Sequence, residues 1–126
     1  MKVLIAEDND DLRTIMANLL RENGYKVTTA SDGKEALEIF LNSGEEYSFL
    51  VTDFNMPYLN GGELIESLYK NKIFVKNIII FSALATNEKL VSKLLTEYPN
   101  VKFLEKSESV YKLLDVLKTE LAAKCT

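Results

Sequence analysis

The sequence predicts an α/β protein built on a doubly wound, five-stranded parallel sheet. Five short apolar runs each precede a segment with helical periodicity. Runs such as VLIA (3–6) and IIIF (78–81) are apolar at successive positions, which is typical of strands covered on both faces. The 126 residues suit one domain with one core. We therefore expect five βα units joined by right-handed crossovers.

The first unit is expected to pair a strand at Lys2–Ala6 with an amphipathic helix. Asn9 or Asp10 can cap the start of this helix, and Gly24 can supply the left-handed turn beyond its end. A single stripe is expected because apolar residues recur at i, i+3, i+4, i+7 and i+8. These residues are Leu12, Ile15, Met16, Leu19 and Leu20.

The remaining four units repeat the order of strand and helix. Their expected strands are Tyr25–Thr29, Ser48–Thr52, Asn77–Phe81 and Val101–Leu104. The second helix is expected to begin near Ser31 or Asp32, the fourth near Thr86 and the fifth near Ser107. The apolar helix positions are Ala36, Leu37 and Phe40, then Leu64, Ile65, Leu68 and Tyr69, then Leu90, Val91, Leu94 and Leu95, and last Val110, Leu113, Leu114, Leu117 and Leu121.

Composition excludes several classes of function. Fifteen basic and nineteen acidic residues give a net charge of −4, which argues against direct binding of nucleic acid. The chain has no histidine and a single cysteine, Cys125, so imidazole bases, histidine metal sites and a disulfide framework are excluded. No apolar run is long enough to cross a membrane and no signal peptide is expected. The expectation is a cytoplasmic protein with one domain over residues 1–126.

Polar side chains gather where four of the predicted strands end. Glu7 and Asp8 follow the first strand, Asp53 the third, Ser82 the fourth and Lys106 the fifth. Ligands of open α/β sheets bind beyond the carboxyl ends of the strands. Each residue alone has a plain structural explanation, such as helix capping, turn formation or a solvated charge. Their coincidence at one edge favours a functional site.

The chemistry of this set indicates transfer of a phosphoryl group to a carboxylate. Three close carboxylates repel one another unless a cation lies among them. Mg²⁺ would relieve the repulsion, because it takes one or two carboxylates and keeps waters or phosphate oxygens as further ligands. Asp8, Asp53 and a backbone carbonyl are the candidate ligands. Lys106 would attract the incoming anion and Ser82 would donate a hydrogen bond, which suits a transfer that needs mainly alignment and charge neutralisation.

Four motifs together resemble the receiver domain of two-component response regulators. They are LIAEDND (4–10), VTDFNMPYLNGGEL (51–64), IIIFSA (78–83) and VKFLEKS (101–107). The resemblance covers essentially the whole chain and is specific in the combination and order of the motifs. It implies the flavodoxin-like (βα)5 receiver fold with strand order 2-1-3-4-5.

The resemblance also implies a role for each matching residue. Asp53 matches the phospho-accepting aspartate, and Glu7 and Asp8 match the acidic pair, with Asp8 the direct metal ligand and Glu7 acting through water. Asn55 matches the residue whose backbone carbonyl binds Mg²⁺. The other matches are Ser82 as the switch hydroxyl, Lys106 as the phosphoryl contact, Phe103 as the aromatic switch, and Met56, Pro57 and Gly61 in the loop after the acceptor.

The partners implied by the resemblance are proteins. A sensor histidine kinase or a phosphotransfer protein would donate the phosphoryl group, and a downstream protein would bind the face formed by the fourth helix, fifth strand and fifth helix. Neither nucleic acid nor a membrane is an expected partner, and a phosphorylation-dependent dimer is left open. The domain would not be an enzyme in the ordinary sense, since it would catalyse only its own phosphorylation and dephosphorylation.

Three positions depart from the common family pattern. Ser107 follows Lys106 where the family often has proline, so a cis X-Pro bond is excluded there. Leu84 is bulky for a position near the phosphoryl group, and we predict that it restricts attacking water and lengthens the phosphorylated lifetime. At the switch position Phe103 has no hydroxyl, so its rotation would be steric. Static packing of Phe103 in the core is the alternative.

Two other functions fit parts of the pattern. A phosphatase with an aspartyl-phosphate intermediate usually has a second aspartate two residues beyond the nucleophile, where this chain has Asn55, which cannot ionise. A receiver-like interaction domain that signals without phosphate is the second alternative. Incubation with Mg²⁺ and a small acyl phosphate separates it from a phospho-accepting receiver.

Overall fold

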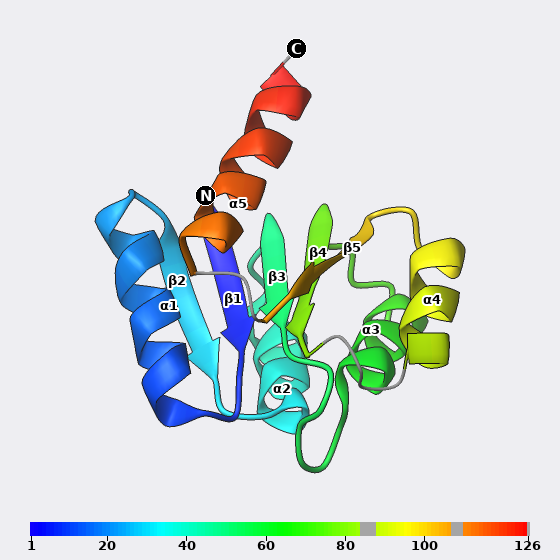
Figure 1. Cartoon of the computed structure of the whole chain (residues 1–126). Helices are drawn as coiled ribbons and strands as arrows, with labels where there is room; N and C mark the ends of the chain where they lie inside the picture. The colour runs from blue at the N-terminus through cyan, green and yellow to red at the C-terminus, as the bar shows by residue number, and fades with distance from the viewer. Residues whose placement is uncertain (84–87, 107–109, 126) are drawn as a thin grey trace.

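Five parallel strands form the centre of the computed structural model, and helices cover both faces of the sheet (Figure 1). The structure describes residues 1–83, 88–106 and 110–125, with side chains of the last range as far as Glu120. The strands are β1 Lys2–Ala6, β2 Lys26–Ala30, β3 Phe49–Thr52, β4 Asn77–Ser82 and β5 Val101–Glu105. The helices are α1 Asp10–Glu22, α2 Gly33–Ser43, α3 Gly61–Lys70, α4 Glu88–Glu97 and α5 Val110–Cys125.

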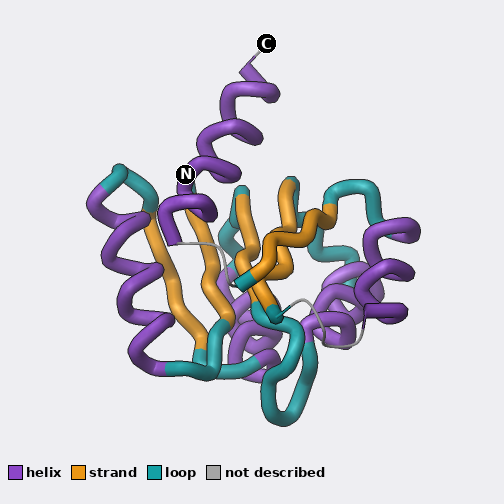
Figure 2. Tube along the Cα trace, in the orientation of Figure 1, coloured by secondary structure: helices purple, strands orange, loops and turns teal. Residues whose placement is uncertain are grey.

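The strand order is β2-β1-β3-β4-β5, and every neighbouring pair is parallel. The tube view shows the regular alternation of strand and helix along the chain (Figure 2). The carboxyl ends of the strands meet at one edge, the lower edge in Figure 1. The predicted fold class and strand order are therefore confirmed.

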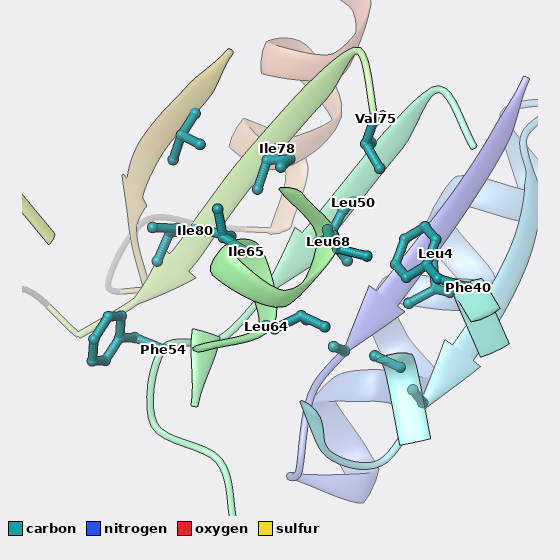
Figure 3. Close-up of a cluster of buried hydrophobic side chains, with 14 of the residues drawn as sticks. Leu4, Phe40, Leu50, Phe54, Leu64, Ile65, Leu68, Val75, Ile78 and Ile80 are labelled. Atoms are coloured by element: carbon teal, nitrogen blue, oxygen red, sulfur yellow. The ribbon is translucent and has the colours of Figure 1, made fainter. Parts of the chain in front are cut away.

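Alternate residues of the strands face two separate hydrophobic clusters. Leu4, Leu50 and Ile78 belong to the cluster covered by α2, α3 and α4 (Figure 3). Val3 and Val51 belong to the cluster covered by α1 and α5. Because both faces of the sheet are buried, the strands are apolar at successive positions, as the sequence indicated.

Three helices begin at side chains that cap their free backbone N–H groups. Asn9 accepts from the N–H of Leu12 at 2.9 Å, and Asp32 accepts from Glu35 at 2.8 Å. Asn60 and Glu63 form a reciprocal capping box at the start of α3. Among the described residues, no helix combines the length and apolar character that a membrane span requires.

Some element boundaries differ from the predicted ones by one residue. The strand β2 begins at Lys26 because the N–H of Tyr25 still bonds to the carbonyl of Leu20, at 3.1 Å, in the last turn of α1. The strand β3 begins one residue late, at Phe49. The strands β4 and β5 each extend one residue further because Ser82 pairs with Glu105.

Some predicted core positions lie at the surface, and others cannot be compared. Ile15 is 54% exposed. Met16, Ala17 and Leu20 form the face of α1 that packs on the sheet, and Ile15 lies to the side of that face, next to α5. Leu90 and, to a smaller extent, Tyr69 and Leu95 are also exposed. The predicted starts of the fourth and fifth helices, near Thr86 and Ser107, lie outside the described residues, as do Leu84 and the side chain of Leu121.

Candidate functional site

The carboxyl edge brings five polar side chains together from four adjacent strands. Glu7 and Asp8 follow β1, Asp53 follows β3, Ser82 ends β4 and Lys106 follows β5. The strand order reverses between β1 and β3, and ligands of doubly wound folds bind at such switch points. The sequence predicted this gathering, and the structure shows it.

Backbone hydrogen bonds extend the sheet by one residue and fix the direction of these side chains. The N–H of Glu7 bonds to the carbonyl of Ala30 at 3.1 Å, and that of Asp53 bonds to Ala6 at 3.0 Å. The N–H of Lys106 bonds to the carbonyl of Ser82 at 2.8 Å. Glu7, Asp53 and Lys106 are therefore each held by a neighbouring strand rather than placed on a free loop.

The carboxylate of Asp53 lies at the centre of the site and accepts three hydrogen bonds. Its Oδ1 accepts from the hydroxyl of Ser82 and from the backbone N–H of Phe54, both at 2.7 Å. Its Oδ2 accepts from Nζ of Lys106 at 2.9 Å. The residue is only 7% exposed. Burial and charge-assisted bonds hold the carboxylate in one orientation, with both oxygens fixed.

Lys106 joins two buried carboxylates. Its Nζ lies 2.8 Å from Oε1 of Glu7 and 2.9 Å from Oδ2 of Asp53. The second oxygen of Glu7 accepts from the N–H of Asn9 at 3.1 Å. The ammonium therefore neutralises part of the negative charge that the acids concentrate at this edge.

The titration of both partners reflects this arrangement. Burial raises the pKa of Glu7, and the nearby acids Asp8 and Asp53 raise it further, against the opposing effect of its hydrogen bonds with Lys106 and Asn9. Burial alone would lower the pKa of Lys106, but its hydrogen bonds and attraction to Glu7 and Asp53 prevail and raise that pKa. The site therefore stabilises the charged ammonium of Lys106 and destabilises the ionised carboxylate of Glu7.

The acidic residues fit a hard divalent cation. Glu7, Asp8 and Asp53 each offer a carboxylate oxygen, and these oxygens lie within 4.8 Å of one another. Asp8 is exposed, and it lines an open hollow of about 520 Å³ together with Asn55. An all-oxygen donor set next to open space suits Mg²⁺, which retains some of its water ligands.

The loop between β3 and α3 returns to the end of β3 through a tight backbone contact. A Cβ on Gly61 would lie 2.6 Å from the carbonyl oxygen of Asp53, so only glycine fits there. The N–H of Gly61 bonds to the carbonyl of Phe54 at 2.7 Å. Within this loop Tyr58 has φ of 70° and is 82% exposed. Met56 is buried against the hydroxyl of Thr52, consistent with a packing role.

Phe103 does not belong to the polar site itself. It lies on β5 opposite Ile80 of β4, is half-buried, and packs against the cluster of α2, α3 and α4. This placement is compatible with static packing and with movement, so the switch role stays a prediction. The peptide bond between Lys106 and Ser107 lies outside the described residues.

Comparison with known proteins identifies the family. The sequence model of the response regulator receiver domain matches residues 3–118. This chain belongs to the response regulator receiver family. The receiver is similar to the chemotaxis protein CheY of Pseudomonas aeruginosa, with 45% identity over 69 residues, which are 54% of each chain.

Further similarities lie in larger proteins and in solved structures. The sensor histidine kinase TmoS of Ectopseudomonas mendocina is 34% identical over 96 residues, which are 76% of this receiver and 10% of TmoS. The receiver domain of the Francisella response regulator 1452 is 33% identical, with a TM-score of 0.78 over 94% of this chain and 93% of that one. The receiver domain of the hybrid histidine kinase CckA is 29% identical, with a TM-score of 0.75 over 96% and 99% of the two chains.

Two contacts in this receiver were not predicted from its sequence. The guanidinium of Arg13 donates to the carbonyl oxygen of Glu7 at 2.8 Å and pairs with Asp10, so α1 anchors the loop that carries the acidic pair. The backbone N–H of Phe54 bonds to the carboxylate of Asp53. The spacing of Asp10 and Arg13 by three residues signals their ion pair, but the contact with Glu7 depends on how the loop folds back.

Proposed function

We propose that this receiver accepts a phosphoryl group on Asp53 from a phosphohistidine of a partner protein. The observation that carries the proposal is the fixed carboxylate of Asp53, held by Ser82, Lys106 and the N–H of Phe54 at 2.7 to 2.9 Å. Residues 1–126 contain no histidine, so the phosphohistidine must lie outside them, in a sensor histidine kinase or a phosphotransfer protein.

In the proposed transfer an oxygen of the Asp53 carboxylate attacks the phosphorus atom. The new bond joins oxygen to phosphorus, the phosphorus–nitrogen bond of the phosphohistidine breaks, and the electron pair and a proton remain with the departing imidazole. Lys106 and Ser82 supply positive charge and a hydrogen bond to the phosphoryl oxygens. The fixed orientation of the carboxylate lowers the entropy lost on reaching the reactive geometry.

Mg²⁺ is the proposed cofactor. Glu7, Asp8, Asp53 and the backbone carbonyl of Asn55 would hold it, with Glu7 acting through water. When bound, the ion neutralises charge on the phosphoryl oxygens and the carboxylates. The geometry supports the fit, since one oxygen of each of these three carboxylates lies within 4.8 Å of the others, and the single ammonium of Lys106 offsets only part of their charge.

Phosphorylation is proposed to change the face formed by α4, β5 and α5. The hydroxyl of Ser82 now bonds to Asp53 and would turn to the phosphoryl oxygens, and the half-buried ring of Phe103 on β5 would then move inward. To move the conformational equilibrium of the receiver from mostly inactive to mostly active, phosphorylation must stabilise the active state over the inactive one by about 5.5 kcal/mol. Several charge-assisted hydrogen bonds supply energies of this order. A downstream protein would bind the altered face.

A labelling experiment tests the proposal. The receiver is incubated with Mg²⁺ and acetyl phosphate, and its intact mass is measured. We expect the mass of one added phosphoryl group for the native chain and for Asp115→Asn, whose exposed carboxylate on α5 is the matched control, but none for Asp53→Asn. Equal labelling of Asp53→Asn, or an unlabelled native chain, would contradict phosphoryl acceptance and favour a receiver that signals without phosphate.

A further inference from the structure

A cavity between α3 and α4 is large enough for one apolar side chain. The two helices lie side by side in Figure 1, and the space between them measures about 140 Å³. Its apolar lining consists of Phe54, Leu90 and Leu94. Phe54 and Leu94 are buried, whereas Leu90 is 51% exposed and marks the entrance. An apolar cavity of about 150 Å³ admits a benzene-sized group.

The rim of the cavity is acidic. Glu63, Glu66 and Glu97 contribute three carboxylates to its lining. Among the described residues that line it, Lys93 is the one basic side chain, and its Nζ lies 3.7 Å from Oε1 of Glu97. The rim therefore keeps a net negative charge around an apolar interior.

We propose that this α3–α4 groove docks a basic segment of a partner protein, which inserts one bulky apolar side chain into the cavity. Lysine or arginine residues flanking that side chain would lie against Glu63 and Glu66. Nucleic acids and anionic membranes fit poorly, because their phosphates would meet the acidic rim. A second copy of this chain fits poorly as well, since each copy carries a net charge of −4.

The groove lies next to the proposed phospho-acceptor but is distinct from it. Phe54 lines the cavity, and its backbone N–H bonds to Oδ1 of Asp53 at 2.7 Å. A partner bound in the groove would contact the residue adjacent to the acceptor. Docking does not itself require phosphorylation, so the test uses the unphosphorylated chain, and its result is independent of the labelling experiment.

A synthetic peptide tests the groove. The probe is an alanine-based helix with one leucine and with lysines one turn before and after it, titrated into the full chain while backbone amide shifts are recorded. We expect saturable shifts on α3, on α4 and at Phe54. Replacement of the peptide leucine by alanine should weaken binding about tenfold, because one aliphatic side chain is no longer buried. Added salt should also weaken binding.

Variants of exposed residues provide matched controls. Leu90→Ser and Glu66→Lys should each weaken binding severalfold. Two control variants should leave peptide binding unchanged. Leu41→Ser matches Leu90→Ser, because Leu41 is 50% exposed and Leu90 is 51% exposed. Glu38→Lys matches Glu66→Lys, because both glutamates are exposed and lie in the middle of a helix. The proposal is overturned by any of four results: no binding at millimolar peptide, equal binding to Leu90→Ser, equal binding of a peptide with glutamates in place of lysines, or self-association of the chain through this groove.

Discussion

Lys106 controls the electrostatic balance of the carboxyl edge. Its ammonium lies within 3 Å of two carboxylates, those of Glu7 and Asp53, at 2.8 and 2.9 Å. The side chain of Glu7 is 1% exposed and that of Asp53 8% exposed, so water neutralises little of their charge. Removal of the ammonium leaves both carboxylates without their cation.

We therefore predict that Lys106→Met lowers the free energy of unfolding by about 2 kcal/mol at neutral pH without Mg²⁺. This value lies below the 3–5 kcal/mol typical of a fully buried pair, because the lysine retains contact with solvent. Urea titration measures the change, with the exposed Lys118→Met as control. If both variants lose equally little, Lys106 does not stabilise the acidic pair.

The buried phenol of Tyr25 makes the free energy of unfolding depend on pH in the alkaline range. Its ring is buried and packs edge-on against Phe49, with centroids 6.3 Å apart. Burial raises the pKa of the phenol, so the folded chain keeps its proton where the unfolded chain, with a pKa near 10, has begun to release it. The stabilisation of the folded chain by the neutral phenol is fully present below about pH 10 and is lost as pH rises toward the pKa of Tyr25 in the folded chain.

We expect the free energy of unfolding to fall more steeply above about pH 10 in the native chain than in Tyr25→Phe. Urea titrations at a series of alkaline pH values measure the two slopes, and the difference between them isolates Tyr25 from other groups that titrate there. Identical slopes would show that the phenol ionises equally in the folded and unfolded chains.

At the scale of the elements, the β3–α3 loop depends on close packing of backbone against backbone. A Cβ at position 61 would lie 2.6 Å from the carbonyl oxygen of Asp53, whereas one at position 62 would meet only side-chain atoms, at 3.3 Å or more. The two neighbouring glycines therefore differ in whether the loop must move to accept a methyl group.

We predict that Gly61→Ala destabilises the fold by about 2 kcal/mol and slows phosphorylation of Asp53, since the loop must shift. Gly62→Ala, its matched control, should change stability by less than about 1 kcal/mol, because alanine favours the helix and offsets the tighter contacts. Thermal unfolding and the rate of labelling by acetyl phosphate measure both effects. Equal losses in the two variants would refute the proposed backbone contact.

The elements of this fold were predictable from local patterns, whereas contacts between loops were not. Apolar runs revealed the buried strands, and Asn9, one of the two caps that the sequence allowed beside Asp10, is the cap that the structure shows, because its side chain acts on a residue close in sequence. The exposure of Ile15 was missed because the pattern of one helix does not show how its neighbour α5 lies. The positive φ of Tyr58 depends on the tertiary path of its loop and leaves no signal in residue type.

The same difference between local patterns and tertiary contacts applies to the functional site. The strand ends predicted that Glu7, Asp8, Asp53, Ser82 and Lys106 meet, because a parallel sheet aligns its carboxyl ends. The sequence did not reveal that Lys106 bonds to both Glu7 and Asp53, since that depends on side-chain geometry across β1, β3 and β5.

At the scale of the whole molecule, a cation bound at the carboxyl edge would stabilise the fold by linkage. A ligand that binds only the folded chain adds about 1.4 kcal/mol to the free energy of unfolding at ten times its dissociation constant. The three candidate ligands come from two segments far apart in the sequence, Glu7 and Asp8 after β1 and Asp53 after β3, so this site exists only in the folded chain.

We predict that Mg²⁺ raises the melting temperature of the native chain and that a chelator reverses the effect. Asp8→Asn should abolish most of the increment, because Asp8 contributes one of the three clustered carboxylates. Asp11→Asn, an exposed acid of the same segment outside that cluster, should retain it. Scanning calorimetry with and without Mg²⁺ makes the comparison. A stabilisation lost equally in both variants would indicate nonspecific screening rather than a site.

The site of the acyl phosphate tests the central claim most directly. The receiver is treated with acetyl phosphate and Mg²⁺, reduced with borohydride, which converts an aspartyl phosphate to homoserine, and mapped by tandem mass spectrometry. The account predicts homoserine at position 53 and at no other aspartate, and only in samples that contained Mg²⁺. Homoserine at another aspartate, or an unmodified Asp53 in a chain that has gained a phosphoryl group, would contradict it.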